Sequence, residues 1–248
     1  HEREVFSLQN APASVPPSRQ ALLAALSGLD YVSLSELERE VDGTVLPGMS
    51  PREQRFAQMY AARSLIHREP NYSYVAARLL LDIVYHEALG EPMDEELMDR
   101  EYIASRYPIL FEQYVRHGVD IGRLTPRLLE FDLAALGRAL RPERDYAFSY
   151  LGLQTLYDRY FIHDDGRRLE TPQLFWMRVA MGLALNEDDP TERAIAFYEM
   201  MSTFRFCPSS PTLFNAGTVH PQLSSCFLTT IQDDLHSIFQ GIYDNAML

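Results

Sequence analysis

The chain has 248 residues, of which 46% are hydrophobic, enough apolar material for a sizeable core in one or two domains. Its 22 basic residues are all arginines and face 35 acidic residues, which gives a formal net charge of −13 at pH 7. This balance argues against binding to nucleic acid or to an anionic membrane, because both need a basic surface. Because the chain has no lysine, any phosphate must be bound by arginine, backbone N–H groups or helix N-termini.

No run of about 18 apolar residues and no signal-peptide pattern is present, so the sequence predicts a cytoplasmic protein outside the membrane. Cys207 and Cys226 are expected to be reduced, because a cytoplasmic chain of this size rarely uses a structural disulfide. No spacing of His, Cys and carboxylate residues predicts a metal site. The first residue is His1 rather than Met, so we expect the numbering to start inside a longer gene product.

The first 90 residues predict a small helical subdomain behind a proline-rich extended start at residues 1–17. Ser33 and Ser50 each precede a glutamate by three positions, which is the spacing of a capping box. The predicted helices cover residues 19–26, 33–41, 50–67 and 73–89.

Residues 91–220 predict a second helical region that contains one β-hairpin. The hairpin is expected at residues 161–170, because Asp165-Gly166 between two partly apolar arms is a strong turn signal. Gly182 lies in an apolar helix and permits tight packing there. The predicted helices cover residues 94–118, a segment from Thr125, residues 133–140, 148–160, 171–185 and 191–206.

The end of the chain gathers small hydroxyl residues on a segment interrupted by proline and glycine. Residues 207–218 predict a loop, and residues 223–231 predict a buried strand with Cys226 at its mouth. A helix is expected from Asp233 to Leu248. Because a lone strand cannot satisfy its own backbone N–H and C=O groups, we expect a strand partner outside this chain.

Residues 210–218 (SPTLFNAGT) and 221–228 (PQLSSCFL) closely resemble the start of the catalytic barrel in the large (α) subunit of ribonucleotide reductase. The resemblance is greatest to class I ribonucleoside-diphosphate reductases. Supporting matches occur at residues 68–80, 148–151, 157–161 and 172–182. Ordered matches over roughly three quarters of a chain are far more specific than one short motif.

The resemblance implies a mainly α fold. A degenerate ATP-cone at residues 1–90 and a helical domain with a β-hairpin at residues 91–220 would form the N-terminal part. Residues 221–248 would supply the first strand and helix of a ten-stranded α/β barrel.

The implied activity is reduction of ribonucleotides, as diphosphates in class I, to 2′-deoxyribonucleotides for DNA synthesis by thiyl-radical chemistry. Cys226 matches the first member of the redox cysteine pair that reduces the ribose and becomes a disulfide. The positions that contact the substrate diphosphate and ribose are matched by Ser210, Thr212 and Ser225. The start of the specificity site, which binds a dNTP effector, is matched by Asp233, Asp234 and Leu235.

Several functional groups of the family would lie beyond residue 248, among them the radical cysteine and the second cysteine of the redox pair. We therefore expect this chain to be inactive without the remainder of the large subunit, supplied by the same gene product or by a second chain of a split subunit. The resemblance also implies a metal-containing, radical-generating β subunit, a thioredoxin or glutaredoxin reductant, and an α dimer. No cofactor is expected on this chain itself, and adenosylcobalamin, as in class II enzymes, is the alternative radical source.

The match to the ATP-cone is poor at the nucleotide site. Val5 to Asn10 replace the usual opening strand, and the expected lysines have no counterpart. Pro17 and His86 or Glu87 stand near positions where basic residues are expected. We therefore predict a cone that keeps its helices for packing and does not bind ATP or dATP.

A non-catalytic helical interaction module is the alternative from a different functional class. Intact Ser225 and Cys226 argue against it, because a relic has no reason to keep a thiol there. Cys207 matches no redox position and is expected to be a packing thiol at a helix end. His163 and His236 are expected at the surface rather than as ligands.

Overall fold

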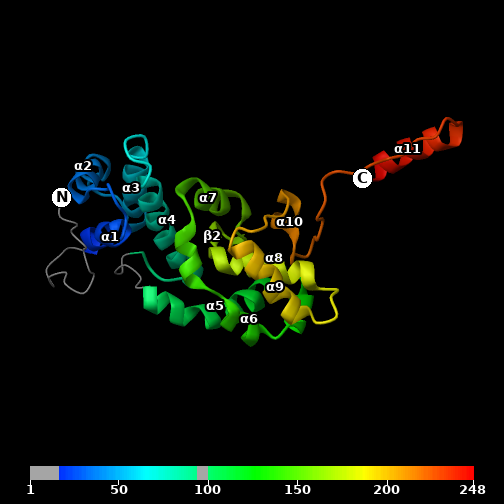
Figure 1. Ribbon diagram of the computed structural model, residues 1–248, viewed down its shortest axis with the longest axis horizontal. Helices are drawn as coiled ribbons and strands as arrows, with labels where there is room; N and C mark the ends of the chain where they lie inside the picture. The colour runs from blue at the N-terminus through cyan, green and yellow to red at the C-terminus, as the bar shows by residue number, and fades with distance from the viewer. Residues whose placement is uncertain (1–16, 94–99) are drawn as a thin grey trace.

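The computed structural model describes residues 17–93 and 100–248, and it is mainly helical, as predicted (Figure 1). The α-helices are α1 (Pro17–Leu26), α2 (Leu34–Thr44), α3 (Pro51–Ser64), α4 (Tyr72–Leu89), α5 (Arg100–Asp120), α6 (Leu133–Ala139), α7 (Tyr150–Thr155), α8 (Pro172–Ala184), α9 (Pro190–Ser202), α10 (Ser210–Asn215) and α11 (Leu235–Met247). The shorter elements are the 3-10 helices η2 (Pro126–Glu130) and η3 (Pro142–Ala147), the π-helical turn η4 (Leu156–Tyr160), and the strands β1 (His163–Asp164) and β2 (Arg167–Arg168). The predicted extended start, including Val5 to Asn10, and residues 94–99 of the helix predicted at residues 94–118 lie outside the described residues.

Local side-chain chemistry sets many of the helix ends. Ser50 and Glu53 form a complete capping box at the start of α3, as predicted. The Ser33 hydroxyl accepts a hydrogen bond from the Glu36 amide, which caps α2. Helix α4 ends at Gly90, whose φ of +71° is the left-handed conformation that glycine adopts at low cost.

Helix α4 is the centre of the N-terminal half, because α1, α3 and α7 all pack against it. Its apolar residues occur on every face, and Tyr72, Val75, Leu80, Ile83 and Val84 are all fully buried. One continuous hydrophobic core connects these side chains with those of the later helices. Within the described residues, no helix has the length and apolar character needed to cross a membrane.

The predicted β-hairpin is present and leads into the second central helix, α8. His163 pairs with Arg168 in an antiparallel register, and Asp165 and Gly166 both have positive φ, as a two-residue hairpin turn requires. Helix α8 is apolar around most of its circumference and packs against α9. The chain therefore passes from the hairpin directly into a helix of the core.

Two predictions around α9 were wrong. The helix ends at Ser202 rather than near residue 206, because Phe204 adopts φ +57° and the following amides turn back to the Met200 carbonyl. The Phe204 ring packs edge-on against Phe148 with centroids 5.0 Å apart, which offsets the strain of a left-handed phenylalanine. As a result Cys207 lies in exposed coil and is not a packing thiol.

The predicted buried strand at residues 223–231 is also wrong, since this segment is coil and largely exposed. It belongs to an arm, defined here as residues 219–248, that runs away from the helical body and ends in α11 (Figure 1). The side chain of Leu228 is as exposed as in an open chain, at 101%. The segment does not form a strand because no described segment is placed to pair with its backbone N–H and C=O groups.

A buried carboxylate joins α4, α5, η3 and α8. Asp145 accepts hydrogen bonds from the hydroxyls of Tyr85 (2.8 Å) and Tyr107 and from the Gln173 amide (2.8 Å). The Gln173 carbonyl in turn accepts from Tyr198, at 2.6 Å. Burial raises the pKa of Asp145 to about 7, although the three donors oppose this shift.

We predict that Asp145 makes the protein less stable as the pH rises through the weakly acidic range. Because the pKa of the folded state lies above the ordinary value of 3.8, the folded chain holds a proton that the unfolded chain loses. The free energy of unfolding of the wild type, relative to that of Asp145→Asn, should therefore fall by about 1.4 kcal/mol for each pH unit between about pH 4 and pH 7. Urea titrations at a series of pH values measure this difference. The exposed Asp120→Asn serves as control, and a difference that does not change with pH would show that Asp145 keeps an ordinary pKa.

Candidate functional site

The stretch predicted as a loop at residues 207–218 contains the short helix α10, so its expected irregular structure was wrong. Ser209 occupies the N-cap position and Pro211 lies in the first turn, where its fixed φ favours a helix. Thr212 and Leu213 are buried against the body, and Gly217 at φ +77° turns the chain away after the helix. We call residues 209–218 the α10 turn.

The predicted substrate residues of the α10 turn lie on different sides of it. The Ser210 hydroxyl lies 3.1 Å from the hydroxyl of Tyr160. The Thr212 hydroxyl donates to the Leu223 carbonyl at 3.3 Å, which ties the turn to the base of the arm. Ser210 is exposed to solvent, whereas Thr212 is buried.

A fully buried ion pair supports the α10 turn from below. Arg178 in α8 and Glu170 before it are both 0% exposed, with Nε and Oε1 2.7 Å apart. The Nη1 group of Arg178 donates to the carbonyls of Leu213 (3.2 Å) and Ala216 (2.8 Å). The ion pair thus fixes the backbone of the α10 turn, and none of these contacts could be read from local sequence.

The Glu170 carboxylate is saturated with donors. It also accepts from the Tyr114 hydroxyl at 2.5 Å and from the Ile162 amide at 2.7 Å. Burial alone would lower the pKa of Arg178, but Glu170 and Tyr114 raise it, so the guanidinium stays charged. The pair therefore joins α5, the hairpin, α8 and the α10 turn through charge-assisted hydrogen bonds.

Backbone contacts hold the other side of the α10 turn. A β-bridge pairs Leu124 with Thr218, the Thr125 amide donates to the Gly217 carbonyl at 3.1 Å, and the Val219 amide donates to the Arg123 carbonyl at 3.3 Å. Gly182 of α8 lies directly beneath, and a Cβ built there would come within 2.2 Å of the Gly217 nitrogen. The tight packing predicted for Gly182 is confirmed.

Ser225 and Cys226 lie on the exposed arm rather than beside the α10 turn. Within the described part of the chain, neither side chain makes a hydrogen bond. The structure therefore does not bring Ser225 and Cys226 together with Ser210 and Thr212, although all four residues lie within one short segment of sequence.

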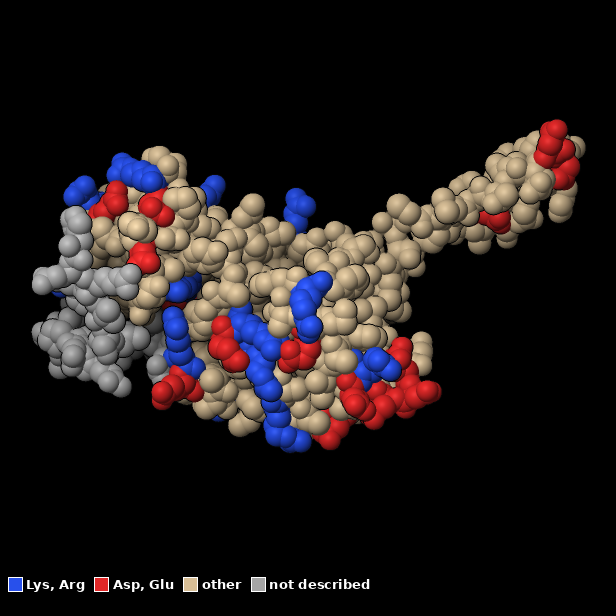
Figure 2. All heavy atoms as spheres, in the orientation of Figure 1, with Lys and Arg blue, Asp and Glu red and all other residues tan. Residues whose placement is uncertain are grey.

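The arm folds back on itself at its far end. Asp234 caps α11 by accepting from the Ser237 amide at 2.9 Å, while Asp233 and Leu235 are exposed. A Cβ on Gly241 of α11 would meet Ile231 at 3.1 Å, so residues near Thr229 and Ile231 lie along the helix. Figure 2 shows that the arm carries few charged side chains, which leaves an extended, mostly uncharged surface.

His86 and Glu87, which the resemblance was expected to place near basic positions of an ATP-cone, are both buried in α4. The Glu87 carboxylate accepts from Arg52 (2.7 Å), from the Tyr157 hydroxyl (2.8 Å) and from the Arg168 amide (3.1 Å). These groups hold α3, the η4 turn and the hairpin against α4. Both positions are thus used for packing between elements.

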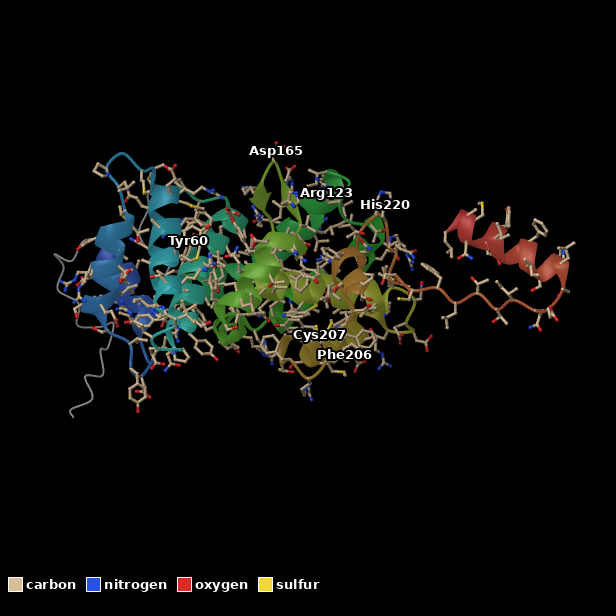
Figure 3. All side chains as sticks on the ribbon, turned by 90° about the horizontal axis from the view of Figure 1, so that it is seen from above. Tyr60, Arg123, Asp165, Phe206, Cys207 and His220 are labelled. Carbon is tan, nitrogen blue, oxygen red and sulfur yellow. The ribbon has the colours of Figure 1, made fainter. Side chains whose placement is uncertain are left out.

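A cleft of about 540 Å³ opens beside the α10 turn and has no counterpart in the sequence-based predictions. It lies between the end of α5, the η4 turn with β1, and residues 214–220. Arg123, Arg159, His163 and His220 line it, and Figure 3 shows Arg123 and His220 on one edge of the molecule, away from Cys207. Among the described residues, no three His, Cys, Asp or Glu side chains are grouped so as to hold a metal ion.

Comparison with known proteins gives consistent matches. Residues 146–221 match the family model of the ribonucleotide reductase all-alpha domain. The chain is 54% identical over 202 residues to the ribonucleoside-diphosphate reductase subunit alpha of Chlamydia muridarum, covering 81% of this chain and 19% of that protein. It is 35% identical over 227 residues to the alpha subunit of Helicobacter pylori, covering 90% and 27%. It is also 32% identical over 226 residues to the large chain of Schizosaccharomyces pombe, covering 88% and 25%. The chain thus spans about a fifth to a quarter of the length of these curated relatives.

We predict that Gly182→Ala destabilises the fold, although alanine is the better helix former. The added methyl group would overlap the backbone of Ala216 and Gly217, with atoms at 2.5 and 2.2 Å, so α8 and the α10 turn must separate. Such overpacking costs roughly 1–3 kcal/mol, measured as the free energy of unfolding in urea.

The matched control is Gly152→Ala in α7, where the nearest side-chain atom would lie at 3.4 Å. There we expect a change of at most about 1 kcal/mol in either direction. Equal effects of the two substitutions would mean that α8 does not lie close to the α10 turn.

Proposed function

Because the chain belongs to the family of ribonucleoside-diphosphate reductase large subunits, of which it is an N-terminal portion, we propose that it works as part of that enzyme. Completed by the rest of its barrel, it would reduce ribonucleoside diphosphates to 2′-deoxyribonucleotides for DNA synthesis by thiyl-radical chemistry. The observation that carries this proposal is the 54% identity to a reductase α subunit over 81% of the chain.

Cys226 is proposed as one member of the redox cysteine pair. Its thiol and that of a second cysteine outside this chain would together give two electrons and two protons, and the ribose 2′-hydroxyl would leave as water. The two sulfurs would end as a disulfide, which thioredoxin or glutaredoxin would then reduce. The exposure of Cys226 supports this role, because a redox thiol must reach both its partner and its reductant.

The substrate diphosphate and ribose are proposed to contact Ser210, Thr212 and Ser225, and a dNTP effector the segment from Asp233 to Leu235. The α10 turn supports this division of roles because the buried ion pair and backbone hydrogen bonds hold it, and a binding group on rigid backbone is pre-organised. The arm would bring Ser225 and Cys226 to the α10 turn once the rest of the barrel is present.

The remainder of the large subunit is the first proposed partner, in the same gene product or as a second chain. The arm supports this proposal, since Leu228, Ile231, Phe239 and Ile242 are exposed apolar residues that an adjoining strand and helices would cover. Further proposed partners are a second large subunit and a metal-containing β subunit that supplies the radical, with adenosylcobalamin as the alternative source. We place the assembly in the cytoplasm.

We also propose that the N-terminal helices form a degenerate ATP-cone that does not bind ATP or dATP. Glu87 supports this, because a carboxylate at that position would repel a triphosphate and is already engaged with Arg52. The helices α1 to α4 would then serve to pack the N-terminal part.

If Cys226 is a member of the redox cysteine pair, Cys226→Ser should abolish turnover. The chain is combined with the remaining part of the large subunit and a radical source, and the reduction of CDP to dCDP is measured. We expect a loss of at least about a thousandfold, because serine cannot supply the electron.

Cys207→Ser is the matched control, since Cys207 is also an exposed thiol of this chain and should leave the rate unchanged. Equal turnover by the wild type and Cys226→Ser would refute the reductant role of Cys226.

A further inference from the structure

The cleft beside the α10 turn carries two arginine side chains that form no ion pair with any described carboxylate, although Asp158 also lines the cleft. Arg123 and Arg159 line it, and within the described residues neither forms an ion pair or a side-chain hydrogen bond. Other arginines nearby are paired, as Arg116 is with Glu112 and Arg178 with Glu170. In a chain of net charge −13, two unpaired guanidinium groups in one cleft indicate a site for an anion.

The remaining polar groups of the cleft are largely occupied by contacts within the protein. Asp158 accepts from the Gln154 amide at 2.7 Å, Asn215 donates to the Gln222 carbonyl at 2.6 Å, and Thr218 donates to the Asn215 carbonyl at 2.8 Å. The two arginines, with their planar forks of N–H donors, are therefore the main free charged groups, and the imidazoles of His163 and His220 lie beside them in the lining. Such forks match the oxygens of phosphate groups.

An aromatic wall adjoins the arginines. Phe214 and Tyr160 stack with centroids 4.4 Å apart and an interplanar angle of 20°, and Phe214 remains 41% exposed. One face of Phe214 is thus covered by Tyr160, while a flat ring can pack against its exposed part. The volume of about 540 Å³ lies in the range of cavities that hold small molecules.

We propose that this cleft binds a polyphosphate anion through Arg123 and Arg159, either free or carried by a nucleotide whose base packs on Phe214. The site is separate from the proposed catalytic residues, since neither Ser210, Thr212, Ser225 nor Cys226 lines the cleft. An anion there would join the end of α5 to the η4 turn, next to the base of the arm.

Titration of the 248-residue chain with inorganic pyrophosphate, followed by calorimetry, tests the proposal. We expect saturable binding at one site, weakened at least tenfold by the double substitution Arg123→Gln/Arg159→Gln. Because both side chains are exposed and unpaired, the variant should unfold at the same urea concentration as the wild type. Arg138→Gln, an exposed arginine of α6 outside the cleft, is the matched control and should bind like the wild type.

A second series with ADP distinguishes the two sources of the phosphate. Tighter binding of ADP than of pyrophosphate, reduced to the pyrophosphate level by Phe214→Leu, assigns a nucleotide, and equal binding assigns the free anion. Cys226→Ser should leave both affinities unchanged, so failure of the reductase assay would not affect this result. Absence of saturable binding, or equal weakening by Arg138→Gln, would overturn the proposal.

Discussion

The buried ion pair between Arg178 and Glu170 is the interaction on which the rest of this structure depends. Two charges removed completely from water are tolerated only when nearly all of their hydrogen-bonding groups are engaged. Here the donors come from Tyr114 and the Ile162 amide, and the acceptors are the carbonyls of Leu213 and Ala216. Three parts of the chain that are distant in sequence, namely α5, the hairpin with α8, and the α10 turn, must meet to satisfy the pair, which specifies their arrangement.

The chain therefore has two parts with different physical character. The helical body, up to the α10 turn, has a continuous hydrophobic core in which Asp145 and the Arg178–Glu170 pair are hydrogen-bonded. The arm has a helix capped by Asp234, but it exposes apolar residues such as Leu228 and Phe239. The α10 turn is thus held by the body, while the thiol of Cys226 lies on the exposed arm.

The sequence predicted those features that depend on local chemistry. The capping box at Ser50 and the hairpin turn at Asp165-Gly166 involve residues within a few positions of each other, and both were found. The strand predicted at residues 223–231 is not formed, because strand formation depends on a partner strand that the described residues do not contain. The meeting of Arg123 with Arg159 in one cleft depends on tertiary packing, so no spacing in the sequence could indicate it.

Hydrogen exchange in a variant with both charges removed tests the central claim, that the buried pair holds the α10 turn. In Glu170→Gln/Arg178→Met no buried charge is left unpaired, so the overall fold should be retained. We predict that the amides of residues 213–219 exchange at least tenfold faster than in the wild type, while those of α4 are unchanged. Unchanged exchange at residues 213–219 would contradict this claim and show that the backbone contacts alone hold the turn.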